Sequence, residues 1–208
     1  MQRGIAAART DSDRSPDRVA VVARYGSAAG CRFFLYVERT AVGDVVRTIV
    51  EDNPDDSEPS ADVPWPRLYG TADVNGDRRS EALVIVAGMA ISRFEIFGAQ
   101  KASLEKFTLG GRRVARFGNG GHNYSAAAVD CLPGQPGRLV SASADRTRRD
   151  WRVSRTTFRV VAMQFRYVAS RRLRVRSLDE LREFSAARNT RRAPFSSCAA
   201  FHRAKHIR

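Results

Sequence analysis

The residues best suited to do chemistry lie in one nine-residue segment, from Asp73 to Glu81, with the sequence Asp-Val-Asn-Gly-Asp-Arg-Arg-Ser-Glu. Oxygen-bearing side chains fall at its positions 1, 3, 5 and 9. A hard cation such as Ca²⁺ takes about six to eight oxygen ligands, and alternate residues of a tight loop can point their oxygens towards one centre. The spacing therefore predicts a Ca²⁺ loop. Its expected ligands are the side chains of Asp73, Asn75, Asp77 and Glu81 and the backbone carbonyl of Arg79.

The sequence after the loop argues against an EF-hand. Position 12, where an EF-hand needs a bidentate Glu, is Val84, and the apolar run Leu83–Val86 predicts a strand where an EF-hand continues as a helix. We therefore expect the loop to join two strands of a β-hairpin. The Asn75-Gly76 pair is a strong hairpin-turn signal by itself, so an ordinary turn with acidic neighbours is the alternative.

Two weaker copies of this pattern accompany the loop. When Asp17–Val22 is aligned with Glu81–Val86, 64 residues later, the ligand positions are taken by Arg9, Asp11, Asp13 and Asp17. The arginine replaces an acid, so this copy should bind a cation poorly. A third copy, around Ala128–Asp130 and Gly137–Val140, keeps the strand and one acid. Repeats of about 60 residues, each too small to bury its own face, predict stacked β-sheet units.

The acidic loop and the Leu83-Val-Ile-Val86 run behind it resemble the FG-GAP and VCBS repeats of integrin-α-like β-propellers and of many secreted bacterial proteins. The resemblance is good over residues 65–97 and degenerate over residues 5–37 and 117–145. In that family the sixth loop position is usually Gly, so Arg78 is expected to adopt a left-handed backbone conformation.

The resemblance implies a Ca²⁺-stabilised, non-catalytic protein of the binding or adhesion type. It would be secreted or held in the cell envelope, with a protein or glycan at the cell surface as its partner. Closed propellers have about four to eight blades, whereas this chain can supply three or four. The implied architecture is therefore an incomplete or small propeller.

Most of the first 176 residues have strand character, because short runs rich in β-branched and aromatic residues are separated by Gly, Pro, Asp and Asn. The glycine-rich stretch Gly118–Gly121 is predicted to form a turn, because no following helix is apparent that could receive a phosphate. The predicted strands are Val19–Val22, Arg32–Val37, Val45–Val50, Ala82–Ala87, Ile91–Phe97, Arg138–Ser143 and Thr157–Val161.

Helical signals come late in the chain. Ser177–Glu180 is a capping-box pattern, and Ser196 or Ser197 is a second candidate cap, for a short helix to about His202. The expected organisation is a mainly β domain with repeated sheet units, followed by a short, Arg-rich helical appendage. The two regions are residues 1–176 and residues 177–208.

The net charge of +14 resides in the C-terminal part. Residues 146–208 contain 18 Lys and Arg against 4 Asp and Glu, and residues 1–145 are neutral. Such a region is typical of proteins that bind nucleic acid or another anionic polymer, and this is the alternative function. Only three of the 36 basic residues are Lys, so codon choice in a G+C-rich genome is a competing explanation of the arginines.

The three cysteines are Cys31, Cys131 and Cys198, and their spacing permits three pairings. In an oxidising compartment one disulfide and one leftover thiol are expected, whereas in the cytosol all three would be small hydrophobic residues. Among the pairings we predict Cys131–Cys198, which would pin the C-terminal segment to the β domain. Cys31 is expected to be buried beside its strand.

The composition, 43% hydrophobic and 28% charged, predicts a folded globular protein. The longest apolar runs, such as Ala82–Ala87, are far shorter than the roughly 18 residues of a membrane span. No recognisable nucleophile or acid–base constellation is apparent, so an enzyme is not expected. The residues from Met1 to Arg9 lack the apolar run of a secretory signal, so we expect either a cytoplasmic protein or a chain that starts downstream of its signal.

Overall fold

The computed structural model describes residues 2–10, 16–25, 31–50, 66–88, 90–100, 103–184 and 193–205. They form two β-sheets and a short helical segment that includes the 3-10 helix η1 (Leu178–Glu180). The strands are β1 (Gln2–Ala8), β2 (Asp17–Tyr25), β3 (Cys31–Arg39), β4 (Asp44–Val50), β5 (Arg67–Asp73), β6 (Glu81–Ala87), β7 (Ile91–Gln100), β8 (Ser103–Lys106), β9 (Thr108–Leu109), β10 (Arg113–Val114), β11 (Arg116–Gly121), β12 (Ser125–Cys131), β13 (Arg138–Arg146), β14 (Trp151–Val161), β15 (Gln164–Val175) and β16 (Ala199–Arg203).

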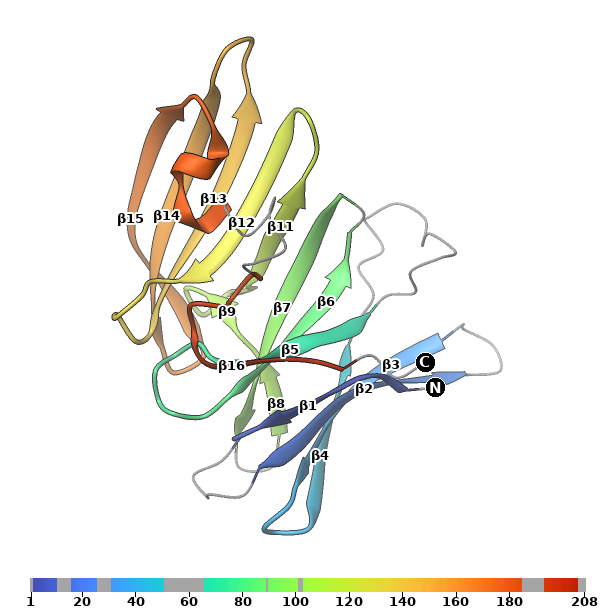
Figure 1. The fold of residues 1–208 in the computed structure, drawn as a ribbon. Coiled ribbons are helices and arrows are strands. Elements are labelled where there is room, and N and C mark those ends of the chain that lie inside the picture. Colours follow the sequence, from blue (N-terminus) through green and yellow to red (C-terminus); the bar gives the residue numbers. More distant parts are fainter. Residues whose placement is uncertain are drawn as a thin grey trace.

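The strands are divided between a small and a large sheet. The small sheet has the order β1-β2-β3-β4. The large sheet has the order β10-β9-β15-β14-β13-β12-β11-β7-β6-β5-β16, with β8 paired to β7. In Figure 1 the small sheet lies below the large one, whose strands β11 to β15 form the upper end of the molecule. The predicted mainly β fold is confirmed.

Three groups of four consecutive strands form antiparallel meanders, and we call them the first, second and third units. They are β1–β4, β5–β8 and β12–β15. The aligned segments Asp17–Val22 and Glu81–Val86 lie in β2 and β6, the second strands of their units, and the third copy falls on β12 and β13. All seven predicted strands lie within observed ones, in β2, β3, β4, β6, β7, β13 and β14.

Strand β6 is buried along its whole length because apolar layers cover both of its faces. One face, with Val84 and Val86, packs against the small sheet in a core that includes Val21 and Leu35. The other face, with Leu83 and Ile85, joins a second core built largely from phenylalanines of β7, β11 and β15. This explains why β6 is an uninterrupted apolar run, since a strand buried on both faces has no polar side to display.

The second and third units are joined edge to edge by β11, which pairs with both β7 and β12. The predicted stacking of separate sheet units is therefore observed between the first and second units, whereas the second and third units belong to one continuous sheet. The glycines of β11 permit the join, because a Cβ on Gly118 would lie 2.9 Å from the Ala127 side chain and one on Gly120 would lie 2.3 Å from the Ala90 carbonyl. The predicted turn at Gly118–Gly121 is wrong, since close neighbours select these glycines.

A short helical segment covers one face of the third unit. Ser177 and Glu180 form the predicted capping box, and Leu178 and Phe184 pack on Trp151 and Val153 of β14. A small helical element near the C-terminus is therefore confirmed. Among the described residues, no helix is long and apolar enough to cross a membrane.

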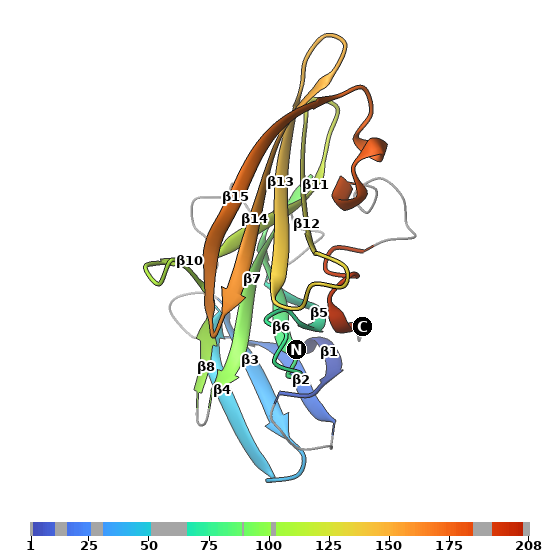
Figure 2. The ribbon, with the colours of Figure 1, turned by 90° about the vertical axis from the view of Figure 1, so that its left-hand side faces the viewer.

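The predicted last helix, capped by Ser196 or Ser197, is wrong. Residues 199–203 instead form β16, which pairs antiparallel with β5. The edge of β5 would otherwise present unpaired backbone groups, and Phe201 of β16 packs beside Tyr69. Both Figures 1 and 2 place η1 and the C-terminal segment on the same side of the large sheet.

The C-terminal segment, residues 193–205, ties all three units together. Cys198 forms a disulfide with Cys131 of β12, which confirms the predicted pairing. Beyond β16, the backbone of Lys205 exchanges hydrogen bonds of 2.9 and 3.1 Å with Ile5 of β1. Cys31 begins β3, but its side chain lies outside the described part of the structure.

Removing the disulfide should lower the free energy of unfolding. The bond joins residues 67 positions apart, and closing a loop of that size reduces the entropy of the unfolded chain. We expect the Cys131→Ser/Cys198→Ser double variant to be less stable by about 4 kcal/mol in urea unfolding. A Cys31→Ser variant serves as the control for losing a cysteine. Equal stability of the double variant and the oxidised wild type would contradict this assignment.

Candidate functional site

The five predicted ligand residues all lie in or beside the loop between β5 and β6. Asp73 is the last residue of β5 and Glu81 is the first residue of β6, so their backbones are held by the sheet. Asn75, Asp77 and Arg79 lie on the loop between them. The loop joins two antiparallel strands, which confirms the hairpin prediction.

The loop is shaped by acidic and amide side chains that accept backbone hydrogen bonds. The Asp73 carboxylate accepts from the N–H groups of Gly76 at 2.6 Å and Arg78 at 2.9 Å. Asn75 Oδ1 accepts from Asp77 N–H at 2.8 Å, and Asp77 Oδ1 accepts from Arg79 N–H at 2.8 Å. These turns explain the alternating Asp and Asn, because short polar side chains stabilise a tight loop by this pattern.

The backbone at Arg78 has φ of 70°, so the predicted left-handed conformation is confirmed. Gly76 also has a positive φ, of 80°, and a Cβ there would lie 2.8 Å from Pro136 in the β12–β13 loop. Gly137 is equally close, since its Cβ would lie 2.5 Å from the Asn75 carbonyl. The loops of the second and third units therefore pack directly on each other.

Two carboxylates are buried at the base of the loop. Asp73 is 7% exposed and Glu81 is 3% exposed, and Glu81 accepts a 2.7 Å hydrogen bond from Val74 N–H. Burial raises the pKa of Glu81 well above its ordinary value, and repulsion by Asp77 and Asp73 raises it further. Burial likewise raises the pKa of Asp73, with a smaller contribution from Asp77. Ionisation of either carboxyl group is therefore unfavourable at these buried positions.

This donor set fits a hard cation in charge and in chemistry. Each carboxylate oxygen has more than one acceptor direction, so an oxygen that accepts an N–H can also ligate a metal. The side chains would still have to move, because no three acidic, His or Cys side chains of the described residues lie as a group that could hold a metal ion. The backbones of Asp73 and Glu81 are held by strands β5 and β6, whereas Asn75 and Asp77 lie on the loop, where their side chains have more room to move towards an ion.

The corresponding acids of the other units have structural partners. Asp17, aligned with Glu81, is 1% exposed and accepts from Thr10 N–H at 2.8 Å and Thr40 N–H at 3.2 Å. Asp130, aligned with Asp73, accepts from Ser197 N–H at 2.9 Å and Ser197 Oγ at 2.7 Å. Asp130 therefore anchors the C-terminal segment beside the disulfide. Asp11 and Asp13 lie outside the described residues, and Arg9 is exposed.

The basic region contains a second candidate site, on the β14–β15 hairpin. In the register of these strands three arginine pairs lie directly opposite each other: Arg152 with Arg174, Arg155 with Arg171, and Arg159 with Arg166. Like charges at directly opposed positions destabilise a sheet. Sequence analysis missed these pairs because it did not recognise β15 as a strand. The available signal was symmetry, since the first two pairs are equally spaced about Met163 in the hairpin turn.

The two faces of this hairpin differ in what covers them. Arg155 points to the side of the helical segment, where its Nε lies 2.7 Å from Oε1 of the buried Glu183. Arg152, Arg172 and Arg174 point to the opposite face. Among the described residues these three guanidinium groups have no hydrogen-bond or ion-pair partner.

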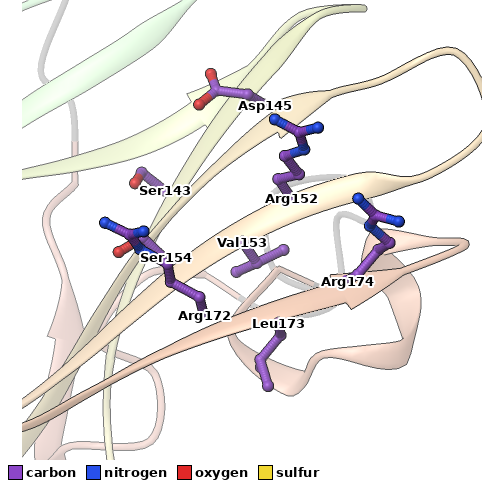
Figure 3. A pocket seen from close by; sticks show the side chains of 8 residues that line it. All are labelled: Ser143, Asp145, Arg152, Val153, Ser154, Arg172, Leu173 and Arg174. Atoms are coloured by element: carbon purple, nitrogen blue, oxygen red, sulfur yellow. The ribbon is translucent and has the colours of Figure 1, made fainter.

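The exposed face is hollowed into a groove of about 450 Å³ (Figure 3). Ser143 of β13 and Ser154 of β14 are opposed on its floor, and the three arginines surround them. Asp145 lies at one end, opposite Arg152 in the β13–β14 register. The groove therefore combines unpaired cations, hydroxyl groups and one carboxylate.

No family model, curated protein or solved structure matches this chain. The two candidate sites are therefore interpreted from their own residues.

Replacing Glu81 by Gln should remove a pH dependence of stability. Because the folded-state pKa is raised, the stability contributed by the neutral carboxyl is full below the ordinary carboxyl pKa and is lost as pH rises through the raised value. Without divalent cations, wild-type stability should fall in that window by up to about 1.4 kcal/mol per pH unit for the one proton. Glu81→Gln should be flatter and more stable at neutral pH.

Urea unfolding at a series of pH values in chelator measures this dependence. Glu105→Gln, which changes an exposed carboxylate on β8, is the matched control and should retain the wild-type slope. Parallel curves for wild type and Glu81→Gln would show that the Glu81 carboxylate is not the titrating group.

Proposed function

We propose that the protein is a non-catalytic binding protein that holds an anionic polymer against the arginines of β14 and β15. The observation that carries this proposal is the set of three directly opposed arginine pairs in one hairpin. Like charges directly opposed in a sheet are destabilising, and Glu183 offsets this only at Arg155. An anionic chain bound to one face of the hairpin would relieve the repulsion of the arginines on that face, so the free energy of binding includes this relief.

The positions of the arginines favour this proposal over codon choice as the explanation of the basic region. A G+C-rich genome explains why basic residues are Arg and not Lys, but it does not explain why they occupy opposed positions. Two of the opposed arginines, Arg152 and Arg174, also surround a groove together with Arg172, and these three lack partners among the described residues. Guanidinium groups donate paired hydrogen bonds to sulfate, phosphate and carboxylate groups.

The disulfide supports export as the setting for this activity. Disulfides persist in secreted proteins and in the cell envelope, whereas the cytosol keeps thiols reduced. The Cys131–Cys198 bond also ties together the parts of the chain that position the third unit. The proposed partner is therefore an anionic polymer, or a protein or glycan that carries one, outside the cytoplasm.

A second candidate function is a Ca²⁺-stabilised repeat of the FG-GAP and VCBS type, and it is compatible with the first. It is favoured by the buried, mutually repelling carboxylates of Asp73 and Glu81. The proposed ligands are these two side chains with Asn75, Asp77 and the carbonyl of Arg79. When bound, the ion supplies positive charge that offsets this repulsion. The loop packs on the β12–β13 loop, so its order would extend to the third unit.

Binding to immobilised heparin tests the anionic-polymer proposal. Retention should fall steeply as salt rises, because each neutralised anion releases counterions. Changing Arg152, Arg159, Arg166 and Arg174 to Gln should lower the slope of log affinity against log salt by about one for each of these arginines that contacts the polymer. The same variant should unfold at a higher temperature at low salt, because two opposed pairs are removed.

A variant with equal charge loss in the small sheet is the matched control. Its substitutions to Gln are at the exposed residues Arg18, Arg24, Arg32 and Arg47. It should retain most of the wild-type affinity for heparin. If the two variants lose affinity equally, binding depends on net charge and not on the hairpin, and the proposal is wrong.

Thermal unfolding with Ca²⁺ and with chelator tests the second candidate. A ligand that binds only the folded state stabilises it by about 2.7 kcal/mol at a hundredfold excess over Kd. We expect a higher unfolding temperature in Ca²⁺, and Asp77→Ala should abolish most of the difference while Glu105→Ala should not. The same temperature in Ca²⁺ as in chelator at matched ionic strength would rule out the ion.

A further inference from the structure

The groove on the exposed face of the third unit lies on a row of small residues that crosses five strands of the large sheet, and we call this row the trench. Residues that are directly opposed on successive strands point to the same face. One such row is made only of small residues until it ends at an arginine. The row consists of Gly120, Ala127, Ser143, Ser154 and Arg172.

Longer, charged side chains border one side of the trench where it crosses β13, β14 and β15. The neighbouring row across β13, β14 and β15 contains Asp145, Arg152 and Arg174. The row on the other side contains hydroxyl groups, including Thr156 and Ser170, whose oxygens lie 3.4 Å apart. Five strands at a spacing of about 4.8 Å give the trench a length of about 19 Å. It therefore accommodates an extended chain and not merely a single ion.

We propose that this trench binds an acidic polysaccharide, with sulfate or carboxylate groups on Arg152, Arg172 and Arg174 and sugar hydroxyl groups on Asp145. This inference rests on the proposed function, and it names the class of polymer and the face that holds it. The trench runs across the strands, so the polymer lies across β11 to β15 and contacts several strands at once.

The presence of a carboxylate among the arginines of the groove favours an acidic polysaccharide over other anionic polymers. A chain with an anion on every unit and no neighbouring donors, such as polyphosphate, is repelled by Asp145. An acidic sugar chain carries anions and hydroxyl groups together, so the same carboxylate can accept a hydrogen bond from it. Single-stranded nucleic acid is generally bound by stacking its bases on aromatic side chains, and the described residues that line the groove include none.

The floor also suits a chain of sugars. Ser143 and Ser154 are exposed and opposed, and their hydroxyl groups can donate or accept. The backbone of the floor is fixed from behind, because Val153 and the neighbouring Leu173 pack on the opposite face against Leu178 and Phe184. In Figure 3 Leu173 points away from the arginines. The site is therefore supported by a packed layer, which keeps its polar groups in place.

Binding of two probes to the full chain tests this inference. The probes are a heparin octasaccharide and single-stranded DNA of matched charge, titrated at the same salt concentration. Wild type should bind the octasaccharide more tightly. Arg172→Gln and Arg174→Gln should each weaken octasaccharide binding about tenfold, the loss of a charge-assisted hydrogen bond.

The matched control uses the third arginine pair of the same hairpin. Arg159→Gln/Arg166→Gln removes two opposed arginines from the face that points away from the trench. It should change octasaccharide affinity by less than about threefold, since only long-range attraction is lost. An equal loss in the control and in Arg172→Gln/Arg174→Gln would place binding on the whole hairpin. The proposed function would then survive and the trench would not.

Asp145→Asn separates the polymer classes. The inference predicts that this change weakens octasaccharide binding, because the amide is a poorer acceptor than the carboxylate, and strengthens DNA binding, because a repulsive charge is removed. Stronger binding of both probes would show that Asp145 only repels anions, and tighter wild-type binding of DNA would identify a nucleic-acid site. Either result overturns the polysaccharide assignment. No binding of either probe at low salt would overturn the proposed function as well.

Discussion

Burial of β6 on both faces is the constraint on which the rest of the structure depends. Its apolar side chains can leave water only if apolar groups cover both faces, so the contact with the small sheet and the second core must both form. Both of its ends are then fixed. The loop from Asp73 to Glu81 enters β6 directly, and burial of the Glu81 carboxylate follows from its place at the start of that strand. The candidate cation loop is therefore positioned by a strand that is buried along its whole length.

The third unit extends away from the small sheet (Figure 1) and joins the rest of the large sheet through β11 and through the short pairing of β15 with β9. Its attachment is completed by the C-terminal segment. Asp130 and Cys131 hold that segment through two hydrogen bonds to Ser197 and one disulfide, and β16 then carries it to β5. An acid that the sequence alignment placed in a degenerate cation loop thus has a structural use.

Local patterns predicted the elements whose causes are local. The strand runs, the hairpin at Asn75-Gly76 and the capping box at Ser177 each depend on neighbours within a few residues, and each is present. The left-handed Arg78, expected from the family resemblance, is also present. The predictions failed where strands far away in the sequence determine the conformation of a segment. Gly118–Gly121 has the composition of a turn, but it forms a strand because β7 and β12 pair with it. Residues 199–203 follow a helix-cap signal, but they form a strand because they pair with the edge of β5. The Cys131–Cys198 bond was one of three permitted pairings, and folding selects it.

The candidate sites differ in the same way. The acidic loop is a short motif, so its residues could be named from the sequence, although their partners and burial could not. The basic site was visible only as a charge excess, because its residues come from three strands whose register places Ser143, Ser154 and Arg172 in one row. Strand β15 was not recognised since its exposed positions carry arginine where a typical strand has β-branched residues. That substitution is itself informative. A hairpin that places arginine opposite arginine gives up stability that Thr or Val would supply at the same positions, and an anionic ligand would recover part of it.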